Sequence, residues 1–148
     1  MTAIVMNTLN GAVTEYDWSF QSITPTHAGS AAGLHEFGGN TDAGSDIDAS
    51  FLTAETSLGS TMKRRIASLY FAMMTETADG EGLALVKGRE GGEFSYPITI
   101  RDGGMSRAIC GNGLRESYIA FGYENVDGAH FRIDLIEPEI IESKQRRL

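Results

Sequence analysis

Residues 111–136 read GNGLRESYIAFGYENVDGAHFRIDLI, and this stretch does most to decide the fold class. Two aromatic-rich runs flank Asp127-Gly128, a residue pair that favours the tight turn of a β-hairpin. In the second run, apolar and polar side chains largely alternate from Phe131 to Ile136, which is the period of a strand with one buried face. The stretch therefore predicts two antiparallel strands that pack one side on a core.

The predicted hairpin also predicts core residues. It would place Phe121 and Tyr123 beside Phe131 and Ile133 on the neighbouring strand, where the side chains of paired residues touch. Phe131, Ile133 and Leu135 would share the buried face. The core residues expected from this pairing are Leu114, Tyr118, Phe121, Phe131 and Ile133.

The rest of the chain shows similar short apolar runs, interrupted by glycines, of which the sequence has 18. Runs bounded by glycine or other turn residues are typical of short strands. One segment, Thr61–Met74, fits both the helical and the strand period; its Tyr70-Phe71 pair favours a strand, and a helix stays open. The other predicted strands are 12–19, 34–37, 47–56, 83–87, 93–100, 106–110, 114–123 and 129–141, with Pro97 marking an edge strand or a bulge.

Together these elements predict an all-β fold, a single antiparallel β-sandwich domain over residues 1–148. We expect about seven to nine strands and at most one short helix, at Thr61–Met74. A chain of 148 residues is one domain on length alone and can bury a core without disulfides. The polar end, residues 142–148, is expected to form a C-terminal arm that becomes ordered on assembly.

The charge of the chain narrows its possible partners. A net charge of −8 and an isoelectric point near 4.8 argue against sequence-independent binding to nucleic acid. Basic residues nevertheless cluster at two places in this acidic chain, and such clusters can contact acidic surfaces of other copies. The candidate interface residues are Lys63, Arg64, Arg65, Lys144, Arg146 and Arg147.

A single cysteine, Cys110, excludes an intramolecular disulfide framework. Residues 1–10 lack the basic and apolar regions of a signal peptide. No run approaches the roughly 20 apolar residues of a membrane span. We therefore expect a protein that is made and kept in the cytoplasm unless a particle carries it out, with no membrane partner.

No catalytic constellation stands out, and we expect neither enzyme activity nor a cofactor. Ser60 and Lys63 match the Ser-x-x-Lys pattern of penicillin-binding enzymes, but the companion Ser-Asp-Asn and Lys-Thr-Gly motifs are missing. Asp42, Asp46 and Asp48 lie close together in the sequence and are weak candidates for a Ca²⁺ site, without the spacing of an EF-hand. Hydrogen bonds to nearby turn amides are the simpler explanation.

Several short motifs resemble, in order, those of a family of tailed-bacteriophage tail proteins. Near the C-terminus these are Gly-Leu-Arg-x-x-Tyr at 113–118, Asn-x-x-Gly-x-x-Phe-x-x-Asp at 125–134, and Arg-Arg at 146–147. The likeness covers residues 16–148. Its earlier matches are Gly33-Leu34-His35, Gly38-Gly39-Asn40-Thr41-Asp42-x-Gly44 and Gly59-Ser60-x-x-Lys63-Arg64.

The resemblance implies a structural protein of a tailed-phage virion, in the tail or at its tip, made in the cytoplasm of the host bacterium. Its partners would be other virion proteins and copies of itself, and the rotational symmetry of virions predicts a ring or a trimer. Two alternatives stay open. Aromatic clusters around Trp18 and at Tyr118–Tyr123 would suit a carbohydrate-binding or host-adhesion module that binds a host glycan, and a capsid decoration protein is the other alternative.

Overall fold

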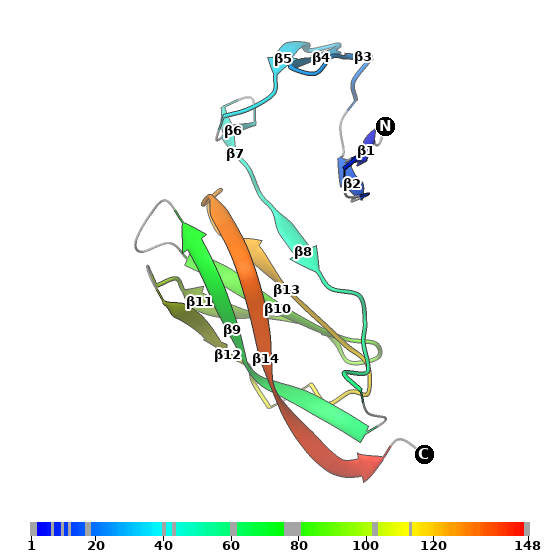
Figure 1. Cartoon of the computed structure of the whole chain (residues 1–148), viewed down its shortest axis with the longest axis vertical. Coiled ribbons are helices and arrows are strands. Elements are labelled where there is room, and N and C mark those ends of the chain that lie inside the picture. The colour runs from blue at the N-terminus through cyan, green and yellow to red at the C-terminus, as the bar shows by residue number, and fades with distance from the viewer. Residues whose placement is uncertain are drawn as a thin grey trace. The chain divides into compact units, whose positions relative to one another are not determined.

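The computed structural model describes residues 3–6, 8–9, 11, 13–16, 19–39, 41–42, 44–59, 62–75, 81–101, 104–112 and 114–146. None of these residues is helical, and all the strand pairs among them are antiparallel. The all-β prediction is confirmed, and the ambiguous segment is a strand, Met62–Thr75. The chain forms two compact units, Met1–Gly39 and Asn40–Leu148 (Figure 1). That the two units form a single domain over residues 1–148 stays a prediction.

The N-terminal unit contains a two-stranded and a three-stranded sheet. Phe20 packs edge-on against Phe37, with ring centroids 6.1 Å apart. Among the described residues of this unit, Ala28 is the only buried apolar residue. Its strands are β1 (Ala3–Met6), β2 (Val13–Tyr16), β3 (Ser22–Ile23), β4 (His27–Ser30) and β5 (Gly33–Glu36).

The larger unit is built on a seven-stranded sheet in the order β14-β9-β12-β11-β10-β13-β8, preceded by a β6–β7 hairpin. This sheet alone has seven strands, whereas the described residues of the whole chain form 14, compared with about seven to nine expected over residues 1–148. Figure 1 shows the long strands β9 and β14 side by side. The strands are β6 (Thr41–Asp42), β7 (Ser45–Asp46), β8 (Ser50–Leu52), β9 (Met62–Thr75), β10 (Glu81–Gly88), β11 (Gly92–Thr99), β12 (Met105–Ile109), β13 (Ile119–Asn125) and β14 (Phe131–Arg146).

The sheet bends so that its halves face each other in a β-sandwich-type arrangement. The ring centroid of Tyr123 on β13 lies 6.0 Å from that of Phe71 on β9 and 4.6 Å from that of Phe131 on β14, although β13 pairs with neither strand. These rings meet across the core that the bend encloses. The buried core comprises Ile66, Leu69, Phe71, Met73, Ala84, Val86, Ile98, Ile100, Ala108, Cys110, Leu114, Ile119 and Tyr123.

The predicted hairpin pairing is wrong, although its turn forms. Asp127 and Gly128 have φ angles of 51° and 66°, and the Ala129 amide donates to the Val126 carbonyl over 3.1 Å. However, β13 pairs with β10 and β8, whereas β14 pairs with β9. The turn therefore carries the chain from one layer to the other, and each strand pairs with other strands of the sheet.

The predicted side-chain orientation of β14, with Phe131, Ile133 and Leu135 on the buried face, is correct only as far as Ile133. The register of its pairing with β9 shifts between Ile133 and Leu135. An extra residue at a β-bulge reverses the alternation of side chains beyond it. As a result Leu135 is 54% exposed, and Ile136 packs against the core instead.

The predicted core residues are confirmed in part. Tyr118 is wrong: it is 37% exposed, and the guanidinium of Arg89 lies 4.1 Å from its ring centroid. It belongs to an irregular segment, because β13 begins only at Ile119. The other predicted core residues are buried or half-buried: Leu114, Phe121, Phe131 and Ile133.

Asn125 fastens the segment before β8 to the end of β13. Its buried amide group donates to the Ile47 carbonyl at 2.8 Å, and its Oδ1 accepts the Ala49 amide at 2.7 Å. The following turn passes close by, since a Cβ at Gly128 would lie 2.6 Å from Cβ of Asp46. The Asn-x-x-Gly motif therefore joins three segments of the fold.

Gly122 on β13 allows the edge strand β8 to pair there. A Cβ built on Gly122 would lie 1.8 Å from the carbonyl oxygen of Phe51 and 3.0 Å from Cα of Leu52. We predict that Gly122→Ala lowers the free energy of unfolding by at least about 2 kcal/mol, because backbone atoms of β8 must move. Urea unfolding followed by circular dichroism measures this change.

Gly104→Ala is the matched control, because a Cβ there meets no heavy atom within 4 Å. Its free energy of unfolding should stay within about 1 kcal/mol of the wild-type value. Equal losses in the two variants would show that β8 does not require the close approach at Gly122.

Candidate functional site

The structure brings the two predicted basic clusters together. The first residues of β9 pair with the last residues of β14, with Arg64 opposite Glu142 and Met62 opposite Arg146. The resulting two-stranded ribbon extends beyond the rest of the sheet at the lower right of Figure 1. Lys63 and Arg65 lie on one of its strands and Lys144 on the other, whereas Arg147 lies outside the described residues.

The predicted C-terminal arm is part of this ribbon as far as Arg146. β14 continues through residues 142–146, and its register with β9 shifts once more between Glu142 and Arg146. That residues 142–148 become ordered on assembly stays a prediction.

Arg64 has its partners within the chain. It is 8% exposed, and its guanidinium donates to the carbonyls of Ser57 and Leu58 and pairs with the carboxylate of Glu142. Its backbone amide and carbonyl form hydrogen bonds of 2.8 and 2.9 Å with Glu116. Arg64 therefore joins the turn before β9, the 116 segment and the end of β14.

We predict that Arg64→Ala lowers the free energy of unfolding by about 2 kcal/mol, because the buried guanidinium holds two carbonyls and a carboxylate. The neighbouring Arg65 points to the other face of the strand and is half-buried. Arg65→Ala should cost less than about 1 kcal/mol and serves as the control. Urea unfolding of both variants tests this, and a larger loss at Arg65 would contradict it.

The predicted Ca²⁺ ligands do not converge. Asp42 and Asp46 lie on the β6–β7 hairpin, Asp48 follows it, and all three residues are exposed. Within the described residues, no three histidine, cysteine, aspartate or glutamate side chains come close enough to hold a metal ion. Ser60 of the Ser-x-x-Lys match lies outside the described residues, so its position relative to Lys63 is not established.

The three aromatic residues of the Tyr118–Tyr123 cluster do not share an exposed face. Tyr123 is fully buried, Phe121 is half-buried, and Tyr118 is exposed beneath Arg89. Trp18 lies outside the described residues.

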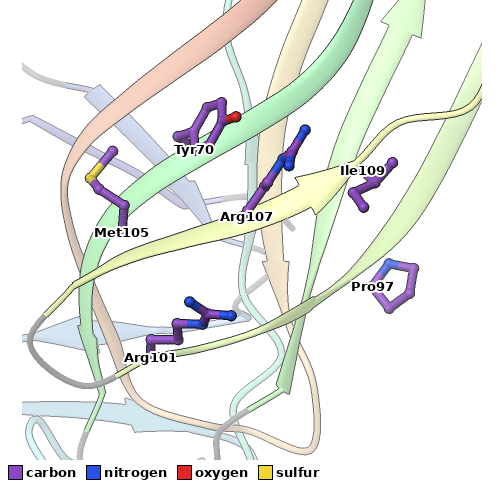
Figure 2. Close-up of a pocket in the computed structure, with 6 residues that line it drawn as sticks. All are labelled: Tyr70, Pro97, Arg101, Met105, Arg107 and Ile109. Carbon is purple, nitrogen blue, oxygen red and sulfur yellow. The ribbon is translucent and has the colours of Figure 1, made fainter.

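A pocket on the outer face of the sheet was missed from the sequence. Its volume is about 600 Å³, and it lies where β11 and β12 separate, since these strands pair only at Thr99 and Arg107 (Figure 2). Figure 2 shows Arg107 on β12 between Tyr70 of β9 and Pro97 on the β11 side. The lining residues are Tyr70, Pro97, Arg101, Met105, Arg107 and Ile109.

Arg107 is held in place from three sides. Its Nε and Nη2 donate to Oγ of the buried Ser68 at 3.0 and 2.7 Å. The Glu139 carboxylate lies 3.5 Å from Nη2, and the Tyr70 ring centroid lies 5.3 Å from the guanidinium carbon. These contacts hold the planar guanidinium group of Arg107 in one orientation in the absence of a binding partner.

Arg101 supplies a second cation to the same pocket. Its side chain is exposed and makes no ion pair with any residue that the structure describes. Two guanidinium groups beside the apolar side chains of Met105 and Ile109 suit a carboxylate flanked by apolar residues. No sequence pattern indicated this pocket, because one isolated arginine on a predicted strand and another just after one are common.

Cys110 directly follows β12 and is buried. Burial raises the pKa of its thiol from 9.0 to about 11, and a backbone hydrogen bond with Leu69 opposes the shift. Burial also raises the pKa of Tyr123, whose hydroxyl makes no hydrogen bond with a described residue. A raised pKa keeps the thiol protonated, so Cys110 is not an activated nucleophile.

The pKa shift predicts a pH dependence of stability. The folded state holds the thiol proton more tightly than the unfolded state, so this contribution is present below pH 9.0 and is lost as the pH rises towards about 11. The stability advantage of the wild type over Cys110→Ala should therefore shrink across that interval. Urea unfolding of both proteins at several pH values measures it, and a constant difference would contradict the assignment.

Comparison with known protein families, curated proteins and solved structures found no significant match. In the part of the chain that the structure describes, no helix qualifies as a membrane span. Function is therefore inferred from the surfaces described above and from the ordered motifs.

Proposed function

We propose that this chain is a structural protein of a tailed-phage virion, a tail or tail-tip component that acts through protein–protein assembly. The ordered motif series supports the phage assignment. The exposed apolar surface of the N-terminal unit supports the assembly role.

The apolar surface of β1 is the observation that carries the proposal. Ile4, Val5 and Met6 are consecutive residues with exposed fractions of 73%, 42% and 59%. Because side chains alternate along a strand, these three residues place apolar side chains on both faces of β1. A two-stranded ribbon is at best marginally stable alone in water, and exposed apolar surface of this kind marks a contact with another protein.

The motif residues serve the fold rather than a reaction. Asn125 binds the Ile47 carbonyl and the Ala49 amide, and Phe131 packs on the Tyr123 ring. Arg64, at the end of the Gly59-Ser60-x-x-Lys63-Arg64 match, joins three segments through its hydrogen bonds. Motif residues that hold the fold together support the proposal of a structural protein.

We expect the purified protein to form a closed oligomer, a ring or a trimer, or to join other virion proteins, because virion components repeat one interface by rotation. Size-exclusion chromatography with light scattering measures the mass. Antibody labelling of particles in the electron microscope locates the chain. Label on the tail supports the proposal, whereas label on the capsid would make the chain a decoration protein.

A glycan array tests the remaining alternative. We expect no binding, since Tyr118, Phe121 and Tyr123 do not form one exposed face. A monomer that binds one class of sugar would instead identify a carbohydrate-binding module for host adhesion.

A further inference from the structure

Charge is divided unequally between the two units. Residues 1–39 contain Glu15, Asp17 and Glu36 and neither lysine nor arginine. All 12 lysines and arginines of the chain therefore lie in residues 40–148. The N-terminal unit is thus acidic and exposes apolar side chains, and it complements a surface that is basic and apolar.

The pocket between β11 and β12 is such a surface. Arg101 and Arg107 supply its positive charge, and Met105 and Ile109 on β12 are 40% and 70% exposed. Figure 2 shows these side chains around the opening left by the two separating strands. Glu139 balances Arg107 at 3.5 Å, which leaves Arg101 as the cation without an ion pair among the described residues.

We propose that the acidic N-terminal unit of one copy docks on the Arg101–Arg107 pocket of a second copy. This inference rests on the proposed assembly function and names the contact that produces it. Carboxylates of the unit would face the two guanidinium groups, while its exposed apolar side chains would cover Met105 and Ile109.

A second copy is the occupant that the proposed assembly function requires, because a contact repeated between copies builds an oligomer. A contact between two different surfaces also closes into a ring when the rotation between copies allows it.

Charge reversal tests the pairing in the full-length protein. Arg101→Glu should weaken self-association by about tenfold or more at low salt, and Glu15→Arg with Glu36→Arg should do the same. The chain that carries all three substitutions should recover self-association, because the charges again attract. Analytical ultracentrifugation measures the dissociation constants, and circular dichroism melting confirms that each variant is folded.

Arg132→Glu is the matched control. Arg132 is an exposed strand residue that pairs with Asp134 outside the pocket, so its reversal should leave association unchanged. Wild-type association in Arg101→Glu, or failure of the combined variant to recover, overturns the pairing while the assembly function stands. A wild-type chain that neither self-associates nor joins virion proteins overturns both.

A cross-linking experiment gives an independent readout. Ile109 is replaced by p-benzoylphenylalanine, and labelled and unlabelled copies are mixed so that contacts between chains are recognised by mass spectrometry. Cross-links from position 109 to residues 1–39 of another copy support the proposal. Cross-links only within one chain, or only to residues 40–148 of another copy, overturn it.

Discussion

The pairing of β9 with β14 determines most of the larger unit. β9 pairs with β14 from Met62 to Thr75 and with β12 from Ser68 to Ala72, so it connects two parts of the sheet. The inner side chains of β9, including Phe71, form one wall of the core. The same ladder places the ion pair of Arg64 with Glu142 at one end of the unit.

Buried polar side chains hold in place the loop segments that take no part in strand pairing. Arg64 holds the turn before β9, and Asn125 holds the segment before β8. Ser68 is buried beneath Arg107 and accepts two of its hydrogen bonds. These side chains bond mainly to backbone groups or to one charged neighbour, although the buried Nε of Arg64 has no partner among the described residues. The bonds that do form favour one position for each loop that they hold.

The two edges of the seven-stranded sheet are poor places for another strand to add. β8 has only three residues, and β14 carries Pro138, several bulges and alternating exposed carboxylates such as Glu137 and Glu139. These are the features by which natural sheets prevent edge-to-edge association. Contact with another copy is therefore expected on the outer face, where β11 and β12 separate, rather than along an edge.

The sequence by itself determined the all-β class, the turn at Asp127-Gly128 and the positions of the basic clusters along the chain, because local alternation and glycine conformations need only neighbouring residues. Which strands pair was decided by the tertiary structure. Only packing across the core sent β13 to β10 and β14 to β9, and only the bulge after Ile133 exposed Leu135. The Arg101–Arg107 pocket likewise arises from the separation of two strands, a long-range geometry that no local pattern encodes.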